Sequence, residues 1–218
     1  MKKIQKNKFL YLGLIFLCQT IYSQSIEELY VKMPDILNPT LTRQNRLEII
    51  EYYKAKQSDS ILNRFGNQAY LLSLDTINQR IKVKNTESST FEMKVGFLED
   101  SIPYVGIIRT ICGPICQSTV EFYDTAWNVI SLKFSIPKSI EWFDNTGIKS
   151  DELDERWVKK SVEVSFVSFC FEKGGDAIIA KNNGLEFLTE LDRKLIKPFM
   201  LTKDFKYKLV GRTWVKEN

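Results

Sequence analysis

The chain has 218 residues, a formal charge of +4, four cysteines and no histidine. The missing histidine excludes a Ser-His-Asp triad, a Cys-His pair and a His-ligated zinc or haem site. We therefore expect no catalytic constellation of these kinds, no metal and no cofactor.

Residues 1–23 have the layout of a secretory signal peptide. Four lysines precede an apolar run from Phe9 to Cys18, and a short polar stretch then ends at Ser23. The apolar run is well short of the ~20 residues that a membrane-spanning helix needs. We predict cleavage after Ser23, no membrane span in the mature chain, and export to the periplasm, the outer-membrane surface or the extracellular space.

The signal segment also carries the surplus charge. Its removal takes away four lysines and no acidic residue, which leaves 27 basic and 27 acidic residues. Residues 193–218 still hold eight Lys or Arg against two Asp or Glu. We interpret them as a solvated basic face, with a phosphate- or glycan-binding strip as the alternative, and overall neutrality predicts no nucleic-acid partner.

Residues 24–218 are predicted to form one domain that begins with helices. Ser25 and Glu28 have the spacing of a capping box, which opens a short helix that Pro34 ends. A second helix is predicted from Thr42 to Lys56. At helical spacing it carries Leu47, Ile50 and Tyr53 or Lys54.

From Tyr70 onward, apolar and polar residues alternate with period two, which indicates β-strands. In residues 91–97 the alternation predicts an apolar inner face that ends at Phe97 and a polar face toward solvent that includes Glu92 and Lys94. Short turns between consecutive strands favour an antiparallel meander. The strands are predicted around residues 81–83, 91–97, 104–112, 117–123 and 128–134.

Residues 135–160 lose the alternation and are predicted to be a long excursion, partly helical after Ser150. Further strands are predicted at 162–171, 177–181 and 205–209. Before Pro198, an amphipathic helix is predicted to carry Leu188, Leu191 and Leu195 on one face. The predicted class is α+β, with N-terminal helices and a C-terminal helix packed on a long antiparallel meander sheet.

Cys112 and Cys116 flank a Gly-Pro turn between two predicted strands. Because export places them where disulfides persist, we interpret them as a structural hairpin disulfide. One alternative is a pairing that involves Cys170, which otherwise is interpreted as a small buried hydrophobe. The other is a redox-active pair, since the motif is similar to thioredoxin-type Cys-Gly-Pro-Cys, although such a thiol needs a helix N-terminus.

Four tripeptides consist of Asp, then Ser or Thr, then an apolar residue, and they are centred on Ser60, Thr76, Ser101 and Thr125. One interpretation is structural, because such pairs form turns and the apolar residue then begins the next strand. The other is chemical. The pattern resembles the acceptor of the general O-glycosylation of exported Bacteroidetes proteins, which makes the four hydroxyls candidate sugar sites.

Carboxylate catalysis is not expected, because a glycosidase needs two carboxylates facing each other across a cleft. Glu92, Glu121 and Asp124 instead occupy positions predicted to face solvent.

Aromatic residues cluster around one predicted hairpin and are expected mostly in the core. An exposed Tyr123 or Trp127 would instead indicate a binding surface. The candidate binding residues are Arg109, Tyr123 and Trp127.

Short motifs along most of the mature chain carry a family resemblance. They include Glu28-Leu29-Tyr30, Met33-Pro34-Asp35, Asn45-Arg46-Leu47, residues 89–94, residues 109–116, Phe122-Tyr123-Asp124, Trp127 and Lys197-Pro198-Phe199. With them the chain resembles a family of exported Bacteroidetes proteins known only as a domain of unknown function. The resemblance implies a secreted globular domain, and it assigns no activity or catalytic residue.

We therefore expect a secreted or periplasmic, noncatalytic binding or accessory protein with a protein or glycan ligand. One alternative is a thiol-disulfide oxidoreductase that uses Cys112 and Cys116. Another is a structural subunit of a cell-envelope assembly.

Overall fold

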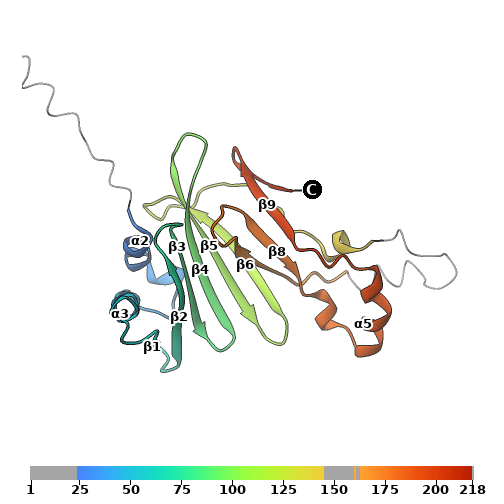
Figure 1. Cartoon of the computed structure of the whole chain (residues 1–218), viewed down its shortest axis with the longest axis horizontal. Helices are drawn as coiled ribbons and strands as arrows, with labels where there is room; N and C mark the ends of the chain where they lie inside the picture. The colour runs from blue at the N-terminus through green and yellow to red at the C-terminus, as the bar shows by residue number, and fades with distance from the viewer. Residues whose placement is uncertain (1–23, 145–159, 161–162, 218) are drawn as a thin grey trace, which may run out of the picture.

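The computed structural model describes residues 24–144, 160 and 163–217, and its strands form two antiparallel sheets (Figure 1). The first sheet is a meander of β1 (Ser60–Leu62), β2 (Gln68–Asp75), β3 (Arg80–Thr86), β4 (Ser89–Phe97), β5 (Pro103–Cys112) and β6 (Cys116–Tyr123). The second has the order β10 (Thr213–Lys216), β9 (Phe205–Val210), β8 (Ile178–Asn182) and β7 (Val167–Phe171). The predicted α+β class and the antiparallel meander are confirmed, and the later strands build a sheet of their own.

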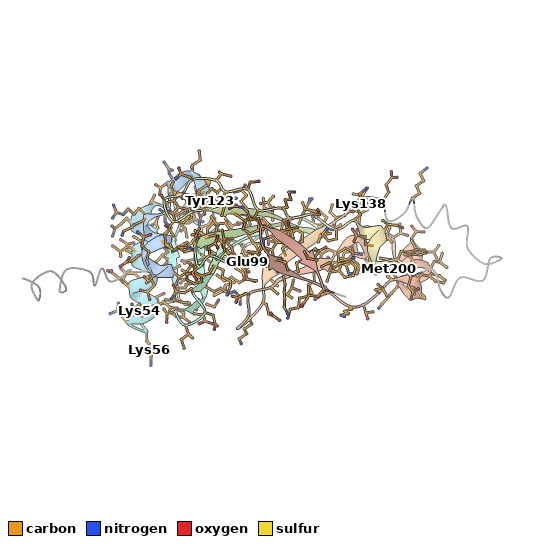
Figure 2. The ribbon with its side chains drawn as sticks, turned by 90° about the horizontal axis from the view of Figure 1, so that it is seen from above. Lys54, Lys56, Glu99, Tyr123, Lys138 and Met200 are labelled. Atoms are coloured by element: carbon orange, nitrogen blue, oxygen red, sulfur yellow. A yellow bond between two sulfur atoms is a disulfide. The ribbon has the colours of Figure 1, made fainter. Side chains whose placement is uncertain are left out.

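The α-helices lie at opposite ends of an elongated molecule. They are α2 (Ile26–Lys32), α3 (Arg43–Lys54) and α5 (Glu190–Ile196). Short 3-10 turns occupy η2 (Asp35–Leu37), η3 (Ser139–Trp142), η4 (Gly184–Phe187) and η5 (Lys197–Phe199). Figure 2 shows Lys54 and Lys56 at the end that holds α2 and α3, far from Met200 near α5.

Side-chain caps start both N-terminal helices where the sequence predicts them. The Ser25 hydroxyl accepts the Glu28 backbone N–H at 3.2 Å, and Pro34 follows the end of α2. Thr42 and Asn45 form a complete capping box at the start of α3. These caps satisfy N–H groups that have no partner inside the helix.

The inward face of α3 differs from the predicted one. Arg46, Ile49 and Ile50 are buried, whereas Leu47 and Tyr53 are both 36% exposed. The buried face of α3 is therefore centred about one residue away from the predicted face. The charged Arg46 side chain can lie in the core because backbone carbonyls accept its hydrogen bonds.

The first core lies between the N-terminal helices and one face of the meander. It is built from side chains of α2, α3 and alternate residues of the strands. Its strand members include Leu71, Ile81, Val83, Phe91, Met93, Val95, Val105 and Ile107. Alternate residues of a strand share one face, so the inner face of β4 from Phe91 to Val95 is apolar, as predicted.

The opposite face of β4 is also buried, which corrects the expectation that its polar residues face solvent. Glu92 is 3% exposed and Lys94 is 4% exposed, while Phe97 at the strand end is 55% exposed. The cause is β7, which packs across this face. A Cβ atom at Gly106 would lie 2.8 Å from the Phe171 ring, so the glycine lets β7 approach closely.

Polar groups of the first sheet bind the backbone edge of β7. The Phe171 N–H donates to Glu92 Oε1 at 3.1 Å, and the Phe169 N–H donates to Ser118 Oγ at 3.0 Å. Glu92 also lies 2.6 Å from Arg80 and 3.5 Å from Lys82. The buried carboxylate is therefore paired, and an edge strand that could aggregate is covered.

The prediction of a strand at residues 128–134 is wrong. Only isolated bridges form there, from Val129 to Tyr123 and from Lys133 to Thr213. Its alternation has another cause, because Leu132 is 8% exposed and Phe134 packs edge-on at 5.2 Å from Phe169 in the second core. Core packing of an irregular segment produces the same alternating pattern as a strand.

The C-terminal helix is shorter and more exposed than predicted. Thr189 caps α5, and Ile196 is its buried residue. Leu191 and Leu195, which the spacing places inward, are 68% and 43% exposed. The predicted signal peptide at 1–23 and the predicted helical part of the excursion at 150–159 lie outside the described residues.

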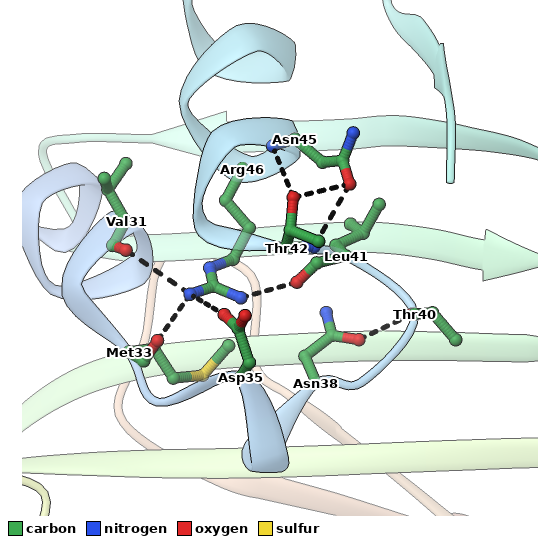
Figure 3. A network of polar contacts seen from close by, with 9 residues as sticks. All are labelled: Val31, Met33, Asp35, Asn38, Thr40, Leu41, Thr42, Asn45 and Arg46. Atoms are coloured by element: carbon green, nitrogen blue, oxygen red, sulfur yellow. Dashed lines mark hydrogen bonds and ion pairs between the residues drawn. The ribbon is translucent and has the colours of Figure 1, made fainter. Parts of the chain in front are cut away.

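Arg46 ties the N-terminal segments together from inside the core (Figure 3). Its side chain is fully buried and donates to the carbonyls of Leu41 at 2.6 Å, Val31 at 3.4 Å and Met33. It also pairs with Asp35 Oδ1 at 2.9 Å. One guanidinium thus satisfies carbonyls from the end of α2 and the loop before α3, where the backbone has no helical partners.

We predict that Arg46→Met lowers the free energy of unfolding by about 3–5 kcal/mol, because it leaves buried carbonyls without a donor. Urea denaturation of the full chain measures this. The matched control is Arg43→Met in the same helix, where the side chain is exposed. We expect the control to change stability by less than about 0.5 kcal/mol. A loss below about 1 kcal/mol for Arg46→Met contradicts the prediction.

Candidate functional site

A cleft of about 510 Å³ opens on the face of the meander opposite α2 and α3. Such a volume lies within the range of small-molecule sites, about 300–1,000 Å³. Four segments meet there: the end of β4, the start of β5, the β7–β8 hairpin and β9. They contribute Gly96, Phe97, Tyr104, Glu172, Gly175, Asp176, Ala177, Lys206, Lys208 and Leu209.

The Tyr104 ring forms the floor of the cleft. It packs edge-on against Phe122, with ring centroids 6.0 Å apart, and it crosses directly over Gly96. A Cβ atom at position 96 would lie 2.5 Å from the Tyr104 ring and hydroxyl, so only glycine leaves room for this position of the ring.

Tyr104 is only 4% exposed as a residue. Its hydroxyl has no hydrogen-bond partner among the described residues and is not one of their fully buried unpaired atoms, so it opens into the cleft. Burial raises the pKa of this hydroxyl well above its ordinary value, and the negative charge of Asp176 adds to the rise. The group therefore stays protonated and can both donate and accept a hydrogen bond.

Lysines and carboxylates alternate around the cleft and pair with one another. Lys206 lies 2.5 Å from Glu172, and Lys208 lies 2.5 Å from Glu217 beside it. The hydrogen bond with Glu172 raises the pKa of Lys206 despite an opposing effect of desolvation. Deeper in the fold, the buried Lys94 reaches Asp176 on the hairpin at 3.0 Å.

A second groove of about 530 Å³ lies between α2 and α3. Its apolar residues are Val31, Leu47 and Ile50, and an ion pair between Lys54 and Glu27, 2.8 Å apart, borders it. It contains no buried polar group aimed into it, so we take the cleft between the sheets as the candidate site.

The predicted disulfide between Cys112 and Cys116 is present at the turn that joins β5 and β6. The Asn183 side chain donates to the Cys116 carbonyl at 2.8 Å, which ties this hairpin to the segment after β8. Cys170 is free and half-buried rather than buried as predicted. Burial raises the pKa of its thiol, and the charge of Glu92 adds to the rise.

The structure brings together the predicted binding residues Arg109, Tyr123 and Trp127, but on the helix side of the meander and away from the cleft. Tyr123 is only 6% exposed and donates to Glu121 Oε2 at 2.5 Å, and Arg109 donates to the same oxygen at 2.7 Å. Arg109 also donates to the Leu37 carbonyl at 3.0 Å. Trp127 is half-buried, with its ring centroid 6.2 Å from that of Tyr123.

Burial alone would raise the pKa of the Glu121 carboxyl. The hydrogen bonds from Tyr123 and Arg109, with the Arg109 charge, outweigh burial and hold this pKa below its ordinary value. The cluster therefore joins η2 to the sheet through mutually satisfied groups.

Three of the four Asp-Ser/Thr tripeptides lie at one end of the meander. Thr76 follows β2, Ser101 follows β4 and Thr125 follows β6, and alternate turns of a meander share an end. Ser60 begins β1 and pairs with Tyr70, near the start of β2, so it lies away from that end. The third residue is buried only in the first tripeptide: Ile61 is 8% exposed, whereas Ile77 is 91% and Ile102 is 52% exposed.

The sequence offers little signal for the cleft itself. Its segments are far apart in the chain, and the lysines of β9 look like an ordinary solvated strand face. Gly96 and Tyr104 are partners in the β4–β5 register, which a sequence pattern does not fix to the residue.

Comparisons with known proteins show a family and a fold. Residues 18–214 match the family described as "Protein of unknown function (DUF3256)". The fold is similar to the structure of a domain of an uncharacterized protein from Porphyromonas gingivalis W83, with a TM-score of 0.73 and 16% identity over 89% of this chain and 99% of that chain. No curated protein matches.

Two further observations hold for the described residues. None of their helices combines the length and the apolar character needed to cross a membrane. Nor do three or more of their Cys, Asp or Glu side chains gather where they could hold a metal ion.

We predict that Glu121→Gln lowers stability near neutral pH more than in acid. A carboxyl whose pKa is lowered on folding stabilises the fold above its ordinary pKa, and this contribution disappears as the pH falls through the folded-state value. Because the Glu121 side chain is still 44% exposed, solvent screens its interactions, and we expect a difference below about 1 kcal/mol at neutral pH that vanishes in acid, below the folded-state pKa.

Urea denaturation of both proteins at several pH values measures this difference. The control is Glu87→Gln, a side chain that is 83% exposed. A difference for Glu121→Gln that stays constant with pH contradicts the prediction.

Proposed function

This chain belongs to the DUF3256 family of proteins of unknown function, and we propose that it is an exported, noncatalytic binding or accessory protein. The observation that carries the proposal is the cleft between the two sheets, a preformed hollow with an unpartnered hydroxyl at its floor and apolar walls. Its carboxylates Glu172 and Asp176 each pair with a lysine, so the cleft offers hydrogen bonds rather than two free carboxylates.

Two observations support export. Residues 1–23 have the three-part layout of a signal peptide. The disulfide between Cys112 and Cys116 is a bond that persists in oxidising compartments outside the cytoplasm. Together they favour a periplasmic or extracellular protein.

A redox function is less well supported. A reactive thiol of the thioredoxin type lies at a helix N-terminus, where the dipole lowers its pKa. Here Cys112 ends β5 and Cys116 begins β6.

A structural subunit of an envelope assembly is the second candidate function. The exposed apolar residues around α5 favour it. They are Phe187, Leu191, Leu195 and Leu201.

We also propose that the exposed tripeptides carry sugars. If the third residue only began the next strand, it would be buried, as Ile61 is. Ile77 and Ile102 are instead exposed at turns, so the whole tripeptide is accessible to a modifying enzyme. Thr76 and Ser101 are accordingly the best candidates, and Ser60 and Thr125, both half-buried, follow.

The binding function predicts that a bulky residue on the cleft rim blocks ligand. The variant is Lys208→Trp, and the control is Lys181→Trp, an exposed lysine on β8 outside the cleft. The probe is the dialysable periplasmic extract of the source bacterium, added to the isotope-labelled mature chain.

We expect NMR shift changes at cleft residues in the wild type and in Lys181→Trp but not in Lys208→Trp, and an unchanged mass spectrum of the extract. Shift changes confined to other surfaces, or conversion of an extract component, contradict the proposal.

The glycosylation proposal predicts extra mass on the natively secreted protein. Thr76→Val and Ser101→Ala are expected each to remove a glycan-sized increment from the intact mass. Ser88→Ala is the matched control, because Ser88 is exposed in a turn at the other end of the meander and follows no Asp. An unmodified wild-type mass refutes the proposal.

A further inference from the structure

The cleft is neutral, and this limits the ligands it can take. Three ammonium groups, on Lys94, Lys206 and Lys208, stand against three carboxylates, on Asp176, Glu172 and Glu217. Each ammonium nitrogen lies within 3.0 Å of a carboxylate oxygen of its partner. An anionic or cationic ligand would therefore have to displace an existing ion pair, and would lose about as much attraction as it gained.

The paired groups nevertheless keep unused hydrogen-bonding capacity. A carboxylate offers about four acceptor sites and an ammonium three donors, and one ion pair uses only part of these. Lys208 and Asp176 have side chains that are 58% and 90% exposed, so their remaining sites are accessible at the cleft. A ligand that both donates and accepts hydrogen bonds through neutral groups can use these sites without breaking the pairs.

The Tyr104 hydroxyl adds an independent sign of a ligand. It is a protonated polar group in a residue that is 96% buried, it lines the cleft, and it has no partner among the described residues. A hydroxyl that opens into a cleft without a protein partner is available to bond a ligand or a water molecule.

The walls of the cleft supply apolar contact. Ala177 and the half-buried Leu209 line the cleft, above the Tyr104 ring. Apolar side chains next to hydrogen-bonding groups suit a ligand that has one apolar face and a rim of hydroxyls. Sugar rings have this construction, with C–H groups on a face and hydroxyls around the edge.

We propose that the cleft binds a neutral saccharide, with the apolar face of its ring against Ala177 and Leu209 and hydroxyls bonded to Tyr104 and to the ion pairs of Glu172 and Asp176. This inference rests on the proposed binding function and names the ligand class for that site. A lipid does not fit, because its chain would strip water from the charged groups without replacing their hydrogen bonds.

The test is an NMR titration of the labelled mature chain with three sets of probes. The neutral set is maltotriose, cellotriose, mannotriose and N-acetylchitotriose, the anionic probe is trigalacturonate, and the zwitterionic probe is trialanine. We expect a neutral oligosaccharide to bind best and to shift cleft resonances. Its affinity is expected to change less than about twofold between about 50 mM and 500 mM NaCl, because no net charge is neutralised.

Two variants test the residue assignments. Tyr104→Phe removes only the unpartnered hydroxyl and is expected to weaken binding about tenfold while leaving the melting temperature unchanged. Leu209→Ala is expected to weaken binding less, by about threefold, because it removes apolar contact. The control is Leu62→Ala, a side chain that is 58% exposed away from the cleft, and it leaves affinity unchanged.

The outcomes separate this inference from the proposed function. Preference for trigalacturonate or trialanine in the cleft, or wild-type affinity of Tyr104→Phe for the bound saccharide, overturns the saccharide assignment but leaves a binding protein. A non-saccharide component identified in the periplasmic extract as the cleft ligand does the same. If neither the probes nor the extract shift any cleft resonance, both proposals fail.

Discussion

The attachment of β7 to the back of the meander is the contact on which the rest of the structure depends. Two backbone N–H groups of β7 donate to Ser118 and Glu92, and Glu92 is held in turn by Arg80 and Lys82. A buried carboxylate that lost these partners would cost about 3–5 kcal/mol. The contact therefore fixes where the second sheet crosses the first, and with it where the β7–β8 hairpin stands against Tyr104.

Local chemistry made the elements predictable. The Ser25 and Thr42 caps, and the alternation in β3 and β4, depend on neighbours a few residues away, which a sequence displays directly. Three of the failures involve partners that the local pattern does not show. Glu92 faces β7, residues 128–134 pack on the second core, and Arg46 binds carbonyls of earlier segments. A periodic pattern records burial, but it does not record what covers the residue.

The site was less predictable than the fold. Sequence motifs drew attention to Cys112–Cys116 and to Arg109, Tyr123 and Trp127, which have distinctive composition. In the structure the cysteines close a hairpin, and Arg109 and Tyr123 satisfy each other through Glu121. The cleft is built from common residues whose only distinction is their position, which arises when four separate segments meet.

Gly96 lowers the stability of β4 but makes room for the Tyr104 ring at the floor of the cleft. Within a strand, glycine is less favourable than alanine by about 0.5–1 kcal/mol, because it loses more backbone freedom on folding. An added methyl group at this position would act as a wedge that pushes the Tyr104 ring outward into the hollow. Because residue 96 has no Cβ atom, the Tyr104 ring can lie close to the sheet, and the cleft above the ring is deeper. The meander is slightly less stable than it would be with alanine in an unobstructed strand.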